Sequence, residues 1–367
     1  MRLCTQTFGG NGARAKLGYT SARKMAGSKL KLLVLLWAAG GGCSAANAPV
    51  PPPASPSSTS NERPTDSDVA ALEPQIDWEA YDSTSLRNPN DGALRAGVPL
   101  PLRAPGIRFN PARDPRARYG TVEVVRALVQ AGARVDRELG GLPVTVNDLS
   151  YEQGGPLPRH RSHQNGRDVD VFFYQLGPDG KPIESVGAFF DPEGAGVDFR
   201  DLADPSDDVP LTIDIPRTWL FLQALIEDER ALLQHIYVAE HLRALLLEYA
   251  EVQDVPAATR ARFEDMTCQP AYPHDDHFHF RFFCTPDDIE EGCRDSAPMY
   301  PWHLKRLLEA GVEPRPLTRA RPEARAKIVT HEEARSTAGP MDAEVERWLD
   351  RRAQWIEKPH PGRPYCP

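Results

Sequence analysis

The sequence predicts an α+β fold in which a small antiparallel sheet is flanked by helices and long loops. Strand-like alternation of polar and apolar residues runs through 168–173 and 277–283. Helical periodicity follows Thr121, where apolar residues recur on one face as far as Val129. The 36 prolines, against only 13 phenylalanines, favour a chain with many loops.

Five further segments complete the predicted order of elements: strands at about 142–149 and 235–238, helices at 218–228 and 241–251, and an amphipathic stretch at 342–355. Gly140 and Gly141 end the first helix, and Pro216 stands where the second begins. Beyond Pro301 the chain is rich in Arg, Glu and Pro, and no chemistry is indicated there.

The chain divides into four predicted segments: a leader at 1–43, a linker at 44–68, one folded domain at 69–300 and a C-terminal extension at 301–367. The linker is rich in Pro, Ser, Ala and Thr and has almost nothing to bury, so it is expected to be disordered. Within the domain, residues 69–118 have scattered apolar positions and are expected to wrap over the core rather than build it.

The leader is typical of an export signal. Lys29 and Lys31 accompany an apolar run that ends at Ala39, followed by three glycines and Cys43. The run is shorter than the ~20 residues that a membrane-spanning helix needs. Small residues before a cysteine suit cleavage by a lipoprotein signal peptidase, although Gly40 stands where such sites usually have Leu. We therefore expect an exported, periplasmic protein with a potential lipid tether at Cys43.

The charge balance argues against nucleic acid as a partner. Seven of the 43 basic residues and none of the 52 acidic residues lie in 1–42, so the remainder carries a net charge of −16. Nucleic-acid binding requires a basic surface. The sequence does not indicate an oligomeric state.

Four cysteines remain after the leader, and an even number in an exported chain predicts two disulfides with three alternative pairings. Cys284 with Cys293 is the preferred pair. That choice leaves Cys268 to pair with Cys366 by subtraction alone.

Five of the ten histidines fall in two short clusters, at 160–163 and 274–279, each with nearby aspartates. In a strand, His277 and His279 project from one face, and Asp168 and Asp170 share a face of theirs. Two adjacent strands can therefore direct imidazoles and a carboxylate to a common point. A catalytic zinc ion takes three such ligands and keeps a fourth position open.

A simpler interpretation applies to each cluster alone. One His-X-His pair is a weak signal, because alternating histidines on an exposed strand can be merely polar. Two clusters with carboxylates in one short exported domain favour a metal site. His160 retains the alternative that it only hydrogen-bonds a loop.

At these residues the chain resembles the penicillin-insensitive murein endopeptidases, within the wider group of lysostaphin-type enzymes, D-Ala-D-Ala metallopeptidases and Sonic hedgehog domains. The group is marked by His-X6-Asp followed by His-X-His, which His163 with Asp170 and His277 with His279 match. The spacing His274-X-X-His277-X-His279 resembles the endopeptidase branch in particular. The resemblance extends over about 92–284.

The resemblance implies a zinc ion bound by His163, Asp170 and His279. It further implies that His277 acts on the water or the transition state and that His274 has a supporting catalytic role. The domain at 69–300 would then be a zinc metallopeptidase.

Two residues beside the clusters are expected to assist. His160 matches a further histidine of the family before the first ligand. Asp276, with Asp275, is expected to orient the imidazoles, the alternative being that both are solvated. The chain departs from the family pattern at Arg167, where an apolar residue is usual, and in the long spacing between Cys284 and Cys293.

The implied reaction is hydrolysis, by a metal-activated water, of the peptide bridge between D-alanine and meso-diaminopimelate in peptidoglycan. One alternative is a D,D-carboxypeptidase or dipeptidase of the same group. The other is a non-catalytic, metal-stabilised module that binds the cell wall. His277 beside the three ligands argues against the binding module.

Overall fold

The structure is a computed structural model and describes residues 76–270, 272–317, 331–356 and 366. These residues belong to the compact unit Glu62–Pro367. The expected leader and linker lie outside the described residues. No helix among the described segments is both long and apolar enough to cross a membrane.

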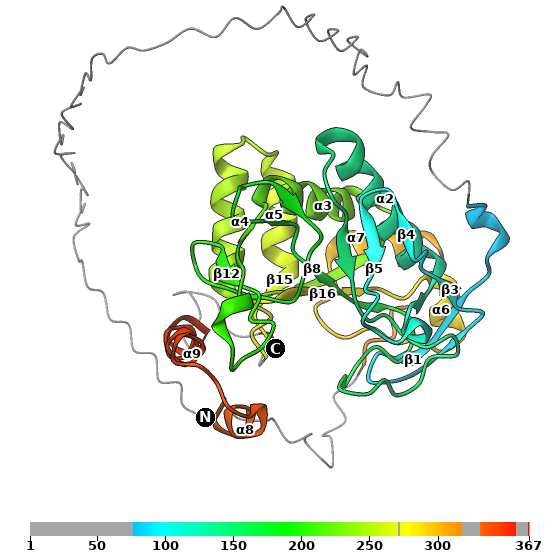
Figure 1. The fold of residues 1–367 in the computed structure, drawn as a ribbon. Helices are drawn as coiled ribbons and strands as arrows, with labels where there is room; N and C mark the ends of the chain where they lie inside the picture. The colour runs from blue at the N-terminus through cyan, green and yellow to red at the C-terminus, as the bar shows by residue number, and fades with distance from the viewer. Residues whose placement is uncertain (1–75, 271, 318–330, 357–365, 367) are drawn as a thin grey trace, which may run out of the picture. The chain divides into compact units, whose positions relative to one another are not determined.

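The predicted α+β class is confirmed, and its main element is a seven-stranded sheet (Figure 1). The strands in spatial order are β15 (Thr267–Cys268), β14 (Leu233–Tyr237), β16 (His277–Phe282), β8 (Asp168–Phe172), β7 (Val144–Val146), β5 (Ile107–Phe109) and β4 (Arg103–Ala104). The sheet is mixed rather than antiparallel throughout, because β14 and β15 are parallel, as are β5 and β7. In both pairs a helical crossover joins the strands, which permits the parallel direction.

The remaining strands form three smaller sheets. These are the hairpin of β1 (Thr84–Asn88) and β2 (Asp91–Arg95), the pair β3 (Val98–Pro99) and β6 (Tyr119–Gly120), and a five-stranded sheet of β10 (Pro182–Ile183), β9 (Gln175–Leu176), β13 (Pro210–Ile213), β12 (Ala195–Val197) and β11 (Phe189–Phe190). They surround the main sheet with short strands and turns, as the proline content predicted.

The expectation that 69–118 only wraps over the core is wrong. β4 and β5 belong to the main sheet, and Leu100 and Ile107 are fully buried. The reason is that β5 is only three residues long, so its alternation was too brief to stand out among the prolines and arginines.

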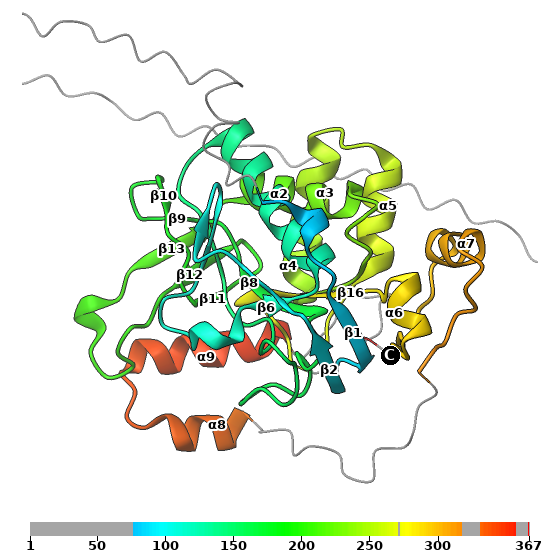
Figure 2. The ribbon, with the colours of Figure 1, turned by 90° about the vertical axis from the view of Figure 1, so that its right-hand side faces the viewer.

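Four helices pack on one side of the main sheet: α2 (Val122–Leu139), α3 (Ile215–Glu227), α4 (Glu240–Val252) and α5 (Ala257–Met266) (Figures 1 and 2). The first three were predicted, with Thr121 and Gly140 flanking α2 as expected. The others are α6 (Pro286–Glu290), α7 (Pro301–Glu309), α8 (His331–Ala338) and α9 (Ala343–Ile356), together with short 3-10 turns at Trp78–Ala80, Pro115–Ala117 and Pro205–Asp207.

The two faces of β16 have different roles. Phe278, Phe280 and Phe282 are buried in the hydrophobic core, and the Phe280 ring lies 6.3 Å from that of Phe221 on α3. The alternate residues, beginning with His277, face away from the helices. The helical layer therefore fixes the strand whose other face carries the imidazoles.

Two disulfides connect described cysteines. Cys284 pairs with Cys293 across the segment that contains α6, and Cys268 of β15 pairs with Cys366, 98 residues later. These are the preferred pair and the pair left by subtraction. The second disulfide ties the C-terminal residues to the edge of the main sheet.

Phe280→Ala is expected to lower the free energy of unfolding by about 3–5 kcal/mol, because it removes a fully buried ring from the core. Leu308→Ala is the matched control, since Leu308 is 79% exposed, and should change the value by less than about 0.5 kcal/mol. Denaturant titration of the oxidised protein measures both. Equal values for the two variants would contradict the core assignment.

Candidate metal centre

The pairing of β8 with β16 places the two histidine clusters side by side. The strands are antiparallel, with His279 opposite Asp170 and Arg281 opposite Asp168. Directly opposed residues on one face of such a pair have side chains within contact distance. The common point expected from the alternation of each strand is therefore present.

His163 joins this point from the loop before β8. Its Nδ1 donates to the carbonyl of Leu149 at 2.9 Å, a tautomer assigned from that contact, so Nε2 keeps its lone pair. His163 has φ of 66°, a backbone conformation that the surroundings must hold. Gly166 helps to shape the same loop, because a Cβ there would lie 2.9 Å from two methyl carbons of Leu94.

Three imidazole nitrogens surround one carboxylate oxygen. Asp170 Oδ1 lies 3.2 Å from His279 Nδ1, 3.4 Å from His163 Nε2 and 3.6 Å from His277 Nε2. Asp170 Oδ1 and His163 Nε2 are buried and have no hydrogen-bond partner in the described part of the chain. Buried polar atoms are rarely left unpaired in this way, so their convergence indicates a ligand.

The spacing of these atoms fits a divalent metal ion. Ligand atoms about 2.0–2.1 Å from a tetrahedral zinc ion lie about 3.3 Å from one another. The distances from Asp170 Oδ1 to His163 Nε2 and to His279 Nδ1 are close to that value. Imidazole nitrogen with carboxylate oxygen is also a donor set that zinc accepts. His163 and Asp170, with either His160 or His279 as a further ligand, can therefore hold a metal here.

His160 competes with His279 for a place in such a group. Ligand atoms of His160, His163 and Asp170 all lie within 4.8 Å of one another. However, His160 Nδ1 faces the other oxygen, Asp170 Oδ2, at 3.6 Å, and its Nε2 contacts Asp148 Oδ2 at 3.1 Å. His160 thus contacts a loop carboxylate and faces the cluster at the same time.

Asp168 and Arg281 hold the ring of His279 from the side away from Asp170. Arg281 donates two hydrogen bonds to the buried carboxylate of Asp168, at 2.8 and 2.7 Å. Asp168 Oδ2 lies 3.2 Å from His279 Nε2, an ion-pair contact that is not aligned as a hydrogen bond. A carboxylate on one ring nitrogen favours a proton there and leaves the other nitrogen free for a metal.

His277 stands at the accessible side of the cluster. Its side chain is 20% exposed, whereas that of His163 is fully buried. Its Nδ1 contacts Asp276 Oδ1 at 2.8 Å, so Nε2 faces Asp170. The expected contact between Asp276 and an imidazole is present.

His274 lies beside His277, with ring centroids 4.7 Å apart. Its Nδ1 donates to the carbonyl of Tyr272 at 2.6 Å, and its φ is 56°. Burial lowers the pKa of His274 to about 3, with help from the neighbouring charges of His277 and His279. His274 is therefore neutral at physiological pH.

The pKa values of the other groups reflect mutual charge stabilisation. Burial by itself would lower the pKa of His277, but Asp276 and Asp170 outweigh it and raise that pKa well above the ordinary value. Burial would raise the pKa of Asp170, but its contacts with His163 and His277 hold it well below its usual range. Burial lowers the pKa of His279, but the neighbouring carboxylate of Asp168 raises it by more, so that this pKa is raised. Asp170 is thus an ionised carboxylate available to a cation.

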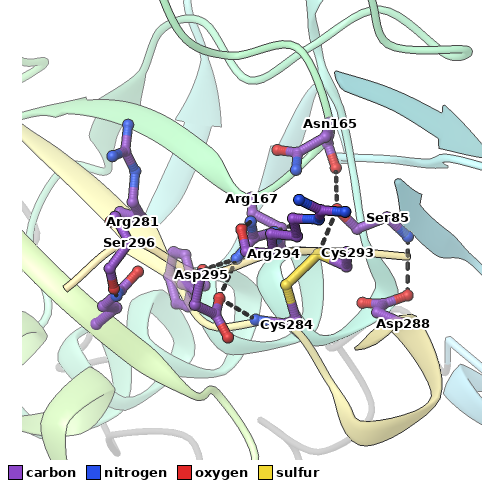
Figure 3. Close-up of polar contacts among 12 residues, drawn as sticks. Ser85, Asn165, Arg167, Arg281, Cys284, Asp288, Cys293, Arg294, Asp295 and Ser296 are labelled. Atoms are coloured by element: carbon purple, nitrogen blue, oxygen red, sulfur yellow. Dashed lines mark hydrogen bonds and ion pairs between the residues drawn. A yellow bond between two sulfur atoms is a disulfide. The ribbon is translucent and has the colours of Figure 1, made fainter. Parts of the chain in front are cut away.

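Arg167 anchors the loop that carries His163. This residue is 1% exposed and donates to the Phe282 carbonyl at 2.6 Å, to Asp295 at 2.8 Å and to Ser85 at 3.2 Å (Figure 3). Asp295 also accepts from the backbone of Cys284, beside the Cys284–Cys293 disulfide. A charged residue is tolerated at this departure from the family pattern because it is fully paired.

A known family model matches the segment that contains the first histidine cluster. Residues 86–185 match the model of the penicillin-insensitive murein endopeptidase family. The resemblance expected from the sequence is therefore confirmed over these residues. None of the curated proteins matches the chain.

The family match and the metal group overlap. The matched segment contains His160, His163 and Asp170, whereas the second cluster at 274–279 lies beyond it. The chain thus carries a segment that matches the model of a murein peptidase family, and the β8–β16 pairing brings the second cluster beside it.

Sequence reasoning missed three supporting residues. Asp148 gave no signal because it belongs to neither cluster. Arg281 shares the face of its strand with His277 and His279, but nothing in the sequence indicated that Asp168 would be its partner. Arg352 lies in the segment assigned no chemistry, yet its Nε is 2.6 Å from Asp275, next to His274.

Divalent metal affinity is expected to fall as the pH falls, beginning above pH 6.5. The raised pKa of His279 means that its proton persists to higher pH than in an ordinary histidine, and a protonated imidazole cannot bind a metal. Calorimetric titration between about pH 5 and 8, in buffers of different ionisation enthalpy, would measure the affinity and the protons released. A constant affinity without proton release would contradict this arrangement.

Proposed function

We propose that this chain is a zinc-dependent murein endopeptidase that hydrolyses D-Ala–meso-diaminopimelate cross-links in peptidoglycan. The observation that carries the proposal is the unpartnered pair His163 Nε2 and Asp170 Oδ1, which lies inside the segment that matches murein endopeptidases. A peptidase family match supports amide hydrolysis of a murein substrate. The donor set supports a metal of zinc's chemistry.

The proposed ligands are His163, Asp170 and His279. His163 Nε2 and His279 Nδ1 face the same oxygen of Asp170, and each ring is held through its other nitrogen, by Leu149 and Asp168 respectively. His160 is assigned to the surroundings of the site, because its nearer contact is with Asp148 and it faces the second oxygen of Asp170.

A bound zinc ion would supply a Lewis acid that polarises the scissile carbonyl and lowers the pKa of water. His277 would move protons at Nε2, since its Nδ1 is engaged with Asp276 and its Nε2 faces Asp170. His274, neutral and held by the carbonyl of Tyr272, would support the same face of the site through hydrogen bonding.

The substrate would meet the site in the cell envelope. Two disulfides among the described residues suit an oxidising compartment, which agrees with an exported protein. We assign the export to the 1–43 segment and a potential lipid tether to Cys43, with 44–68 as the linker to the catalytic domain. Such a tether would let the catalytic domain reach peptidoglycan from a membrane surface.

Metal analysis is expected to find about one zinc per chain in the wild-type protein and little in His163→Ala or His279→Ala, because a catalytic site needs all three protein ligands. His160→Ala is the matched control, a histidine of the same cluster that should retain most of the metal. Thermal unfolding would confirm that each variant is folded. Metal retention in His279→Ala together with metal loss in His160→Ala would reverse the assignment.

The zinc-loaded protein is expected to convert cross-linked muropeptide dimers into monomers, and a chelator should stop the reaction. His277→Ala should lower kcat by about 100-fold or more while zinc remains bound, since general acid–base catalysis contributes about 10²–10⁴-fold. Separation of the products by liquid chromatography measures both effects.

Other products in that assay would decide between the alternatives. Release of terminal D-alanine with intact dimers would indicate a carboxypeptidase or dipeptidase. Binding of peptidoglycan without any cleavage would indicate a metal-stabilised binding module.

A further inference from the structure

Arg352 of α9 makes a buried ion pair with the loop that carries two of the site histidines. Its Nε and Nη2 donate to Asp275 Oδ2 and Oδ1 at 2.6 and 2.8 Å. Asp275 is fully buried, and the Arg352 side chain is 10% exposed. Two parallel hydrogen bonds from a guanidinium to a carboxylate fix orientation as well as distance.

Asp275 lies between His274 and the Asp276–His277 pair, so its position affects both imidazoles. The loop is also held by its backbone, because Phe190 donates to the Asp275 carbonyl at 2.9 Å and Ala239 donates to the His274 carbonyl at 3.1 Å. His274 has φ of 56°, which the surroundings must maintain. Within the described part of the chain, the Arg352 fork is the side-chain hydrogen bond that reaches this loop from another element.

Arg352 is itself held on more than one side. Its guanidinium carbon lies 3.9 Å from the centre of the Phe189 ring on β11, a cation–π contact. The end of α9 is tied to Gln269, the residue after β15, whose amide donates to the Ile356 carbonyl at 2.8 Å. α9 is therefore held in place by contacts on other elements where it reaches the loop.

α9 also borders the space beside the site. A cavity of about 700 Å³ lies between α9 and the region of β11 and β12. In Figure 2, α9 runs below these two strands. Arg352 and Asp276 are among the residues that line the cavity. Asp276 contacts His277 at 2.8 Å, so this wall of the cavity continues into the histidine cluster. The extension beyond residue 301 is thus in contact with the site, although it lies outside the family match.

We propose that Arg352 is a positioning residue that, through Asp275, holds the 274–277 loop so that His277 Nε2 faces Asp170. This inference rests on the proposed function, and it makes the C-terminal extension part of the catalytic unit. Without Arg352 the carboxylate of Asp275 would be buried and unpaired, and the loop would move to expose it to water. The imidazoles of His277 and His274 would then lose their fixed orientation while the metal ligands stayed in place.

The test compares Arg352→Met, Arg352→Lys and Asp275→Asn in the full oxidised chain. Arg335→Met is the matched control, because Arg335 borders the same cavity from α8 but pairs with Asp350 rather than with the loop. Each protein is measured for zinc content, thermal unfolding, kcat and KM on cross-linked muropeptide dimers. Nitrogen-15 spectra of histidine-labelled, zinc-loaded protein report the His277 Nδ1 proton directly.

Arg352→Met and Asp275→Asn are expected to lower kcat by about 10–100-fold, the usual effect of losing an orienting partner, with zinc content and KM nearly unchanged. The His277 Nδ1–H signal should broaden or shift in both. Arg352→Lys should restore part of kcat, because it keeps the charge but not the fork. Arg335→Met should behave as the wild-type protein does.

Three results would overturn the proposal: an unchanged kcat and His277 signal in folded Arg352→Met, a loss of zinc in parallel with kcat, or a loss of cooperative unfolding in all three variants. The last two would make the ion pair a requirement of the metal site or of the fold. If the wild-type protein binds zinc but leaves dimers intact, the proposed function fails. The His277 signal would still decide whether Arg352 positions the loop.

Discussion

The site depends on the antiparallel register of β8 against β16. That register sets Asp170 opposite His279 and Asp168 opposite Arg281. Because side chains alternate between faces, a slip of one residue would turn the carboxylates toward the helical layer and separate them from the imidazoles. The phenylalanines of β16 resist such a slip, since they are buried against the helices. Hydrophobic packing on one face of the sheet thus determines the chemistry available on the other.

Buried ion pairs then fix the parts of the site that the sheet does not. Asp168 pairs with Arg281, and Asp295 with Arg167, and in both pairs the carboxylate is buried. Such pairs add little net stability, because desolvation opposes the attraction of the charges. Breaking one is costly, however, and this makes each pair a specific constraint on where its two segments lie.

The sequence predicted what local periodicity can encode. β8, β16 and α2 were recognised because their alternating or helical patterns are long enough to be distinctive, and the common face of His279 and Asp170 followed from period two. The helix α5 was missed because its residues are only weakly amphipathic. The contact of Arg352 with Asp275 joins residues 77 apart, and no local pattern signals such a pairing.

The link between Cys268 and Cys366 makes the attachment of the C-terminal residues depend on redox conditions. Cys366 also donates from its backbone to the Gln269 carbonyl at 2.9 Å, so the covalent and the non-covalent ties lie together. In a reducing cytosol the two thiols would stay apart. Their oxidation closes a 98-residue loop, which stabilises a fold by about 4–5 kcal/mol in the chain-entropy account. The tie between Cys366 and β15 would therefore form only in an oxidising environment.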